Sequence, residues 1–149
     1  MLGTFESRWI RQTSLSHSLV FSLIGTGGIK MPRSFQVTVG GLNGLRAYPV
    51  HAVAGTQVMR WNVEDRRILI RDVLQMASLG SAIFWDGAHA WGPGSEGEGS
   101  FNDAGIGLRI APPRSALGPV FRVDLAWPIA PTRDGRRQPV LSIGSNQAF

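Results

Sequence analysis

Arginine and carboxylate side chains recur at alternate positions of four segments, with small residues between them. The set contains four cations and four anions. Bidentate pairs between Arg and a carboxylate are strong charge-assisted hydrogen bonds, and they matter most where little water is present. The set therefore predicts a network of ion pairs. Its members are Arg60, Arg66, Arg109 and Arg122 with Glu64, Asp86, Asp103 and Asp124.

Residues for covalent or metal chemistry do not fall at suitable spacings. The chain has no Cys, which excludes disulfides, thiolate metal sites and cysteine nucleophiles. His17, His51 and His89 share no metal-binding spacing, and no Gly-x-Ser-x-Gly motif accompanies them. Residues 25–30, GTGGIK, lack the Gly-Lys-Ser/Thr ending of a phosphate loop. We therefore expect no catalytic, cofactor or metal site, and no enzyme activity.

Period-two alternation indicates the elements that position the charges. The 19 Gly and 9 Pro leave little room for helices. Residues 56–70, 101–111 and 120–128 alternate cleanly between an apolar and a polar face, 79–91 alternate less cleanly, and 19–24 are typical of a further strand. The sequence predicts an all-β fold: an antiparallel meander of about six or seven strands in a single region, residues 1–149.

The composition of the polar face favours a confined interior. Solvated sheet faces usually carry Lys, Thr and Glu, whereas here Arg balances carboxylates among Gly and Ala, and Lys30 is the only lysine. Such a balance suits the polar lumen of a transmembrane barrel, where unpaired charge is costly. An ordinary solvated sheet face stays open as the alternative.

The lengths of the expected connections agree with a barrel. Expected turns at 71–74 and 112–118 alternate with longer loops at 92–100 and 129–138. An aromatic girdle is expected from Trp61, Trp91 and Trp127, with Trp85 nearer mid-strand.

The net charge of +5 suggests nucleic-acid binding only at first sight. The predicted lumen charges cancel, so the excess lies on loops and turns, most densely at Arg133, Arg136 and Arg137. A solvated loop explains this group best, with anionic lipid headgroups as the alternative contact. We expect no nucleic-acid partner.

Five short motifs occur in the order found in one bacterial family. They are Gly-Gly and Arg-Ala-Tyr within 40–49, Glu-x-Arg at 64–66, Phe-Trp-Asp-Gly at 84–87, Gly-x-Gly-x-Arg at 105–109, and Leu-Gly-Pro followed by Arg-Val-Asp and Pro within 117–128. From about residue 19 to residue 149, the chain resembles the C-terminal barrel portion of the bacterial surface antigen superfamily. That superfamily includes the BamA-type assembly factor, its TamA relative and the two-partner secretion transporters.

The resemblance implies a long loop, about residues 31–55, that folds back into the lumen of an outer-membrane barrel. In the family the Arg of this loop pairs with acids on the barrel wall, and the matching residues here are Arg46 with Glu64 and Asp86, the loop latch. A guanidinium carried inside a barrel on a Gly-rich loop must also find carboxylates on physical grounds, and alternation turns both of these inward. We expect the latch to stiffen the C-terminal half of the barrel.

The end of the chain carries a barrel signal in the same resemblance. Leu141 and Ile143 alternate, and the chain ends on Phe149, so the last strand is expected to be read by the assembly machinery. Neither periplasmic repeat domains nor an export signal are recognised in the sequence. Because an open sheet in lipid would leave two edges unpaired, we expect a fragment whose barrel is closed by missing N-terminal strands or by other chains.

The function that the resemblance implies is insertion or translocation of polypeptides at the bacterial outer membrane. Outer-membrane lipid and unfolded client polypeptides are the expected partners. Two alternatives stay open. One is a soluble β-sandwich binding module with Met59, Ile106 and Val123 in its core, and the other is a barrel that anchors an enzyme encoded upstream.

Overall fold

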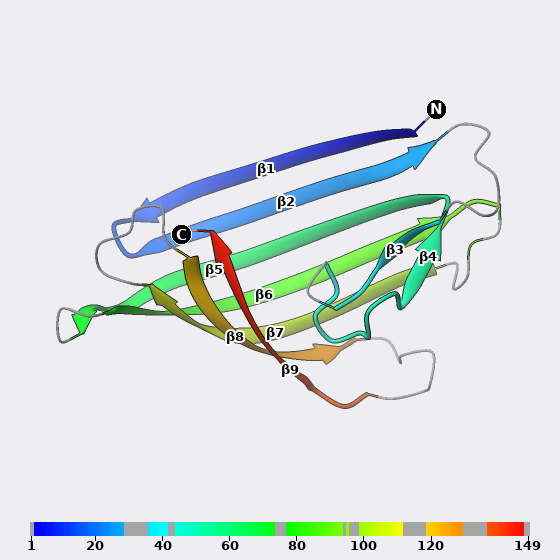
Figure 1. The fold of residues 1–149 in the computed structure, drawn as a ribbon. Helices are drawn as coiled ribbons and strands as arrows, with labels where there is room; N and C mark the ends of the chain where they lie inside the picture. The colour runs from blue at the N-terminus through cyan, green and yellow to red at the C-terminus, as the bar shows by residue number, and fades with distance from the viewer. Residues whose placement is uncertain are drawn as a thin grey trace.

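Seven antiparallel strands form one sheet in a computed structural model that describes residues 2–28, 36–41, 44–73, 77–93, 95, 99–111, 119–129 and 137–147. The predicted all-β antiparallel fold is confirmed. Apart from the step from β2 to β5, each strand lies beside its neighbour in the chain (Figure 1). The described residues contain no apolar helix of membrane-spanning length. The strands of the sheet are β1 (Leu2–Ser14), β2 (His17–Gly28), β5 (Gln57–Val73), β6 (Ala77–Trp91), β7 (Gly99–Ala111), β8 (Pro119–Pro128) and β9 (Val140–Gln147).

The first hairpin, β1 with β2, extends well beyond the strand predicted at 19–24. Its register runs from Leu2 opposite Gly28 to Ser14 opposite His17. Alternation is blurred in β1 because it is an edge strand whose two faces both carry mixed side chains, and every residue of β1 is exposed. The hairpin turn is tied to β5, since the amide of Ile68 donates to the carbonyl oxygen of Ser16 at 2.8 Å.

The turn predicted at 71–74 begins too early. β5 continues to Val73, and its pairing with β6 shifts register between Ile68 and Ile70 and again between Ile70 and Val73. Each shift adds a residue without ending the strand, so the period-two pattern is lost while the ladder continues. The long strands β5 and β6 therefore extend beyond their neighbours at this end of the sheet (Figure 1).

The two faces of the sheet reverse the usual distribution of polarity. Glu64, Asp103 and Asp124 are at most 3% exposed, whereas Ile83, Ile106 and Ile143 are 54–69% exposed. Paired residues share a face, so the register places the carboxylates on one side and the aliphatic residues on the other. The alternative of a solvated polar face is wrong for these charges, because that face is the covered one.

A short hairpin covers the polar face. β3 (Val37–Val39) pairs with β4 (Val53–Gly55), and both lie over the inner side of the sheet, which curls at β8 and β9 (Figure 1). Part of the loop predicted at 31–55 is thus a two-stranded sheet, while residues 29–35, 42 and 43 lie outside the described part. The buried apolar core is small and lies between this segment and β5–β8. It consists of Val39, Leu45, Ala47, Tyr48, Val53, Val58, Phe84, Ala88, Ala90 and Ala126.

We predict that Gly87→Ala destabilises the fold by about 1–3 kcal/mol because of overpacking. The indole of Trp61 lies where a Cβ at position 87 would be, and this indole also meets that of Trp85 edge to face, with 6.1 Å between ring centroids. Gly25→Ala is the matched control, since nothing lies within 4 Å of its added Cβ. Urea unfolding of both variants measures the difference. Equal loss of stability would show that the Trp61 contact does not constrain position 87.

Candidate functional site

The loop tip is a tight turn that aims one side chain at the sheet. The amide of Gly41 donates to the carbonyl oxygen of Tyr48 at 2.9 Å, and the amide of Tyr48 donates to the carbonyl oxygen of Leu45 at 3.2 Å. Gly44 has φ +126°, a conformation that L side chains rarely adopt. Leu45 and Tyr48 are buried against the inner face of the sheet. The turn therefore fixes the backbone of Arg46, between these two residues.

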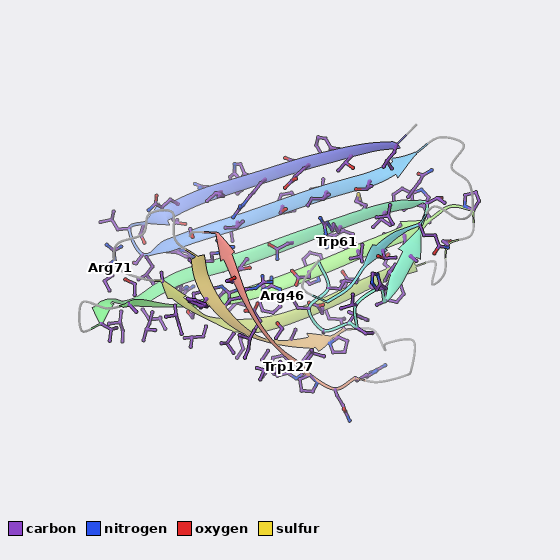
Figure 2. The ribbon with its side chains drawn as sticks, viewed as in Figure 1. Arg46, Trp61, Arg71 and Trp127 are labelled. Carbon is purple, nitrogen blue, oxygen red and sulfur yellow. The ribbon has the colours of Figure 1, made fainter. Side chains whose placement is uncertain are left out.

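Arg46 reaches from the loop to carboxylates on three strands (Figure 2). Its Nε donates to Asp86 Oδ2 at 2.7 Å, and its Nη2 donates to Asp86 Oδ1 at 3.1 Å, a bidentate pair. Nη2 also donates to Glu64 Oε2 at 3.2 Å, and Nη1 donates to Asp124 Oδ2 at 3.0 Å. We call these four residues the loop-tip cluster. All are at most 5% exposed, so the charges interact where water screens them little.

Further arginines complete the shell of the loop-tip cluster. Arg109 joins two of its carboxylates, donating to Glu64 Oε1 at 2.8 Å and also to Asp124. Arg66 Nε donates to Glu64 Oε1 at 3.0 Å, and Arg122 Nε lies 3.8 Å from Asp124 Oδ2. Each carboxylate thus receives more than one donor. A buried charge that is paired and hydrogen-bonded in this way avoids most of the penalty of burial.

The side chain of Asp103 binds the backbone of the loop. Its Oδ2 accepts a hydrogen bond of 2.9 Å from the amide of Ala47, the residue after Arg46. The hydroxyl of Tyr48 donates to the carbonyl oxygen of Asn102 at 3.1 Å, on the same strand β7. The Tyr48 ring also meets Phe101 edge to face, with 5.7 Å between centroids. β7 therefore binds the backbone and Tyr48, while the strands on either side of it bind the guanidinium.

The Phe84 ring forms the floor under the Arg46 guanidinium. The Arg46 Cζ lies over the ring, 3.4 Å from its centroid, a cation–π contact. Burial by itself would lower the pKa of Arg46, but the charge and hydrogen bonds of Asp86, followed by the charges of Glu64 and Asp124, outweigh it and raise that pKa above its usual value. The guanidinium therefore stays charged at every physiological pH.

Two glycines of β7 make room for this arrangement. A Cβ at Gly105 would overlap the Phe84 ring, and one at Gly107 would overlap the carboxylate of Asp124 and the guanidinium of Arg109. The Gly-x-Gly pattern in this strand thus marks close approach of side chains to the backbone. The packing cannot accept a methyl group at either position without moving the groups that hold Arg46.

The predicted contacts of the loop latch are present, and the structure adds members that the sequence prediction lacked. Asp124 was assigned only to the surrounding network, although it binds Arg46 directly. Asp103 was expected among the charge pairs, yet it accepts a hydrogen bond from the backbone amide of Ala47 and forms no ion pair within the described part of the chain. Arg60 lies against Gly44 at the loop tip. The role of Phe84 was also missed, and its place on the polar face of an alternating strand was the available signal.

The remaining residues considered in the sequence fall at separate places. His17 pairs with Asp65 at 3.0 Å, His51 lies 2.7 Å from the Thr38 hydroxyl, and His89 lies 3.0 Å from that of Ser100. Among the described residues, no group of three or more His, Asp or Glu could hold a metal ion. Leu141 and Ile143 are exposed on the outer face of β9, and Phe149 lies outside the described residues.

We predict that Arg46→Ala destabilises the loop-tip cluster by about 3–5 kcal/mol, because three buried carboxylates lose a shared partner. Arg46→Lys should recover only part, since an ammonium cannot match the bidentate fork. Arg67→Ala is the control, because its pair with Asp65 is exposed and exposed pairs contribute about 0–1 kcal/mol. Thermolysin cleavage at buried Leu45 reports release of the loop. Cleavage at the parental rate in Arg46→Ala would contradict the latch.

We also predict that Asp124→Asn weakens loop retention as much as Glu64→Gln does, within about twofold in the rate of thermolysin cleavage. Both carboxylates pair with Arg46 and with Arg109, so either change removes one charge from the same pair of arginines. Because the amides preserve shape and volume, the comparison isolates charge. A parental cleavage rate in Asp124→Asn alone would place that residue outside the latch.

Comparisons with known proteins leave the geometry as the basis for a functional proposal. No family model, no curated protein and no solved structure matches this chain. The observations available are therefore the buried cluster that fixes the loop, the exposed apolar face of the sheet, and the sequence motifs that supply the residues of both.

Proposed function

We propose that this chain is part of an outer-membrane β-barrel of the BamA and TamA type, which inserts or translocates polypeptides at the bacterial outer membrane. The observation that carries the proposal is the reversed polarity of the sheet, together with a loop fixed on its charged face by Arg46. In this proposal the apolar face contacts lipid, and the charged face lines the lumen.

The extent of the exposed apolar surface supports contact with lipid. Soluble monomers rarely expose contiguous apolar patches above a few hundred Å², yet large apolar side chains are exposed on every strand of this sheet. Between β2 and β9 no described element covers them, because the short hairpin β3–β4 packs on the opposite face. The exposed set includes Phe5, Trp9, Phe21, Met59, Ile83, Trp85, Ile106, Leu108, Phe121, Trp127, Leu141 and Ile143.

Four aromatic residues of this face lie in one row across the sheet. The register row runs from strand to strand through Trp9, Phe21, Val63, Trp85, Ala104 and Trp127. Three tryptophans therefore occupy one register row. Trp85 lies in the middle of β6, and the register makes it level with Trp127, which lies near the end of β8. Figure 2 labels Trp127. Rows of Trp are typical of the membrane interface, where the ring is buried and its N–H stays near water.

Strand length supports the same proposal. A tilted strand crosses a bilayer with about 9–11 residues, and β1, β5, β6 and β7 contain 13, 17, 15 and 13. The surplus would extend the strands past the hydrocarbon region, where outer-membrane barrels have their loops.

The soluble sandwich does not fit the described sheet. Its core would contain Met59 and Ile106, which are 38% and 54% exposed. A sandwich also requires a second sheet against the apolar face, whereas the two-stranded sheet packs on the charged face. This supports the membrane proposal over the soluble one.

The loop-tip cluster would serve that function by holding the loop across the lumen. Arg46 joins β5, β6 and β8 through their carboxylates, and Ala47 adds β7, so the loop braces four consecutive strands. We propose that this brace fixes the curvature of the wall while a client polypeptide is handled. The role in handling clients rests on the resemblance of the loop and strand motifs.

The proposal predicts that Trp85 and Trp127 are quenched by bromine on lipid acyl chains. The test uses variants that keep one tryptophan each, folded into vesicles of brominated or unbrominated phosphatidylcholine. We expect quenching by at least about half for both, because both rings lie on the face proposed to contact lipid. A chain that stays monomeric in buffer without detergent, with both tryptophans unquenched, would overturn the proposal.

A further inference from the structure

An open cavity of about 470 Å³ is lined by the loop tip and by residues of β1, β2 and β5, with one residue each from β6 and β8. Its volume is within the range of about 300–1,000 Å³ that small-molecule sites occupy. The loop supplies part of its wall through Gly44 and Arg46. The sheet supplies the rest, so the cavity is complete only when the loop is in place.

The charged residues of the cavity wall are mostly arginines. Five arginines line it, against three carboxylates. Two of these carboxylates, Glu64 and Asp86, already accept hydrogen bonds from Arg46. The wall therefore has a formal excess of cations, and much of the available acceptor capacity is used. The charged lining residues are Arg8, Arg46, Arg60, Arg66 and Arg122, with Glu6, Glu64 and Asp86.

Two of these arginines have guanidinium nitrogens available. Arg8 forms no ion pair with any residue in the described ranges. Arg66, which also lines the cavity, donates its Nε to Glu64, so that pair does not use its two terminal nitrogens. Arg8 and Arg66 also repel each other as like charges. An anion between them would relieve that repulsion.

We propose that this cavity binds an anion of the phosphate class, held by Arg8 and Arg66 with Arg60 beside the loop tip. Guanidinium groups bind phosphate oxygens through paired N–H donors, which a point charge cannot do. The site differs from the loop-tip cluster, because its ligand replaces water in the cavity while the protein carboxylates keep their own partners. The inference does not depend on the proposed role in polypeptide handling.

Binding in this cavity is linked to the position of the loop. Gly44 and Arg46 belong to the wall. Gly44 lies against the Arg60 side chain, since a Cβ added at Gly44 would be 3.3 Å from the Arg60 Cδ. A ligand that binds only the assembled wall stabilises the loop in place by mass action. By reciprocity, a variant that releases the loop weakens the anion site.

The test measures calorimetric binding of inorganic phosphate by the full chain in neutral detergent micelles, at constant ionic strength set by chloride. Arg8→Gln and Arg11→Gln form a matched pair, since both residues lie on the exposed strand β1, but only Arg8 lines the cavity. We expect about tenfold weaker binding in Arg8→Gln, the loss of one charge-assisted hydrogen bond, and parental binding in Arg11→Gln. Phosphate should also slow thermolysin cleavage at Leu45.

A second arm identifies the source of the phosphate group. It replaces inorganic phosphate with dodecyl phosphate in the same micelles. Arg8-dependent binding of inorganic phosphate indicates a soluble ligand, and Arg8-dependent binding of dodecyl phosphate alone indicates a lipid headgroup. Equal binding by Arg8→Gln and Arg11→Gln with both probes, or no binding of either probe, would overturn the site. Neither result would affect the bromine-quenching test of membrane contact.

Discussion

The burial of charge beneath the loop is the constraint on which the rest of this structure depends. A single guanidinium or carboxylate in this position would cost several kcal/mol, so each group must find partners within the protein. The cluster meets that condition collectively, because Glu64 serves Arg46, Arg66 and Arg109 at once. The loop cannot leave without removing the cation that Glu64, Asp86 and Asp124 share.

This constraint determines how tightly the backbone must pack nearby. The glycines of β7 let Phe84 and Arg109 lie directly on the strand, and the ring of Phe84 then supports the guanidinium of Arg46 from below. Apolar packing is correspondingly limited to the area under the loop. Most of the aliphatic surface of the sheet faces outward, so its burial depends on what surrounds the protein and contributes little to the packing within it.

The sequence predicted the faces of the strands well but gave little information on register. Alternation assigned Glu64 and Asp86 to the same side of the sheet, and the resemblance of the loop motif supplied Arg46 as their partner. It could not show that Asp124 reaches the same guanidinium. β8 is separated from β6 by β7, and alternation does not indicate which residue of β7 lies opposite Asp124. Alternation did not indicate the edge strand β1, because this strand has no covered face to impose a pattern. It also ended β5 too early, because two register shifts interrupt the period of two.

The number of strands in the sheet has a topological consequence. Seven consecutive antiparallel neighbours place β1 and β9 at opposite edges, and both strands run in the same direction. If β1 paired directly with β9, the two strands would therefore be parallel. The same holds if β1 of one sheet paired with β9 of an identical sheet in the same orientation. A ring that is antiparallel throughout has an even number of strands. Any such ring that contains this sheet must gain an odd number of strands from elsewhere.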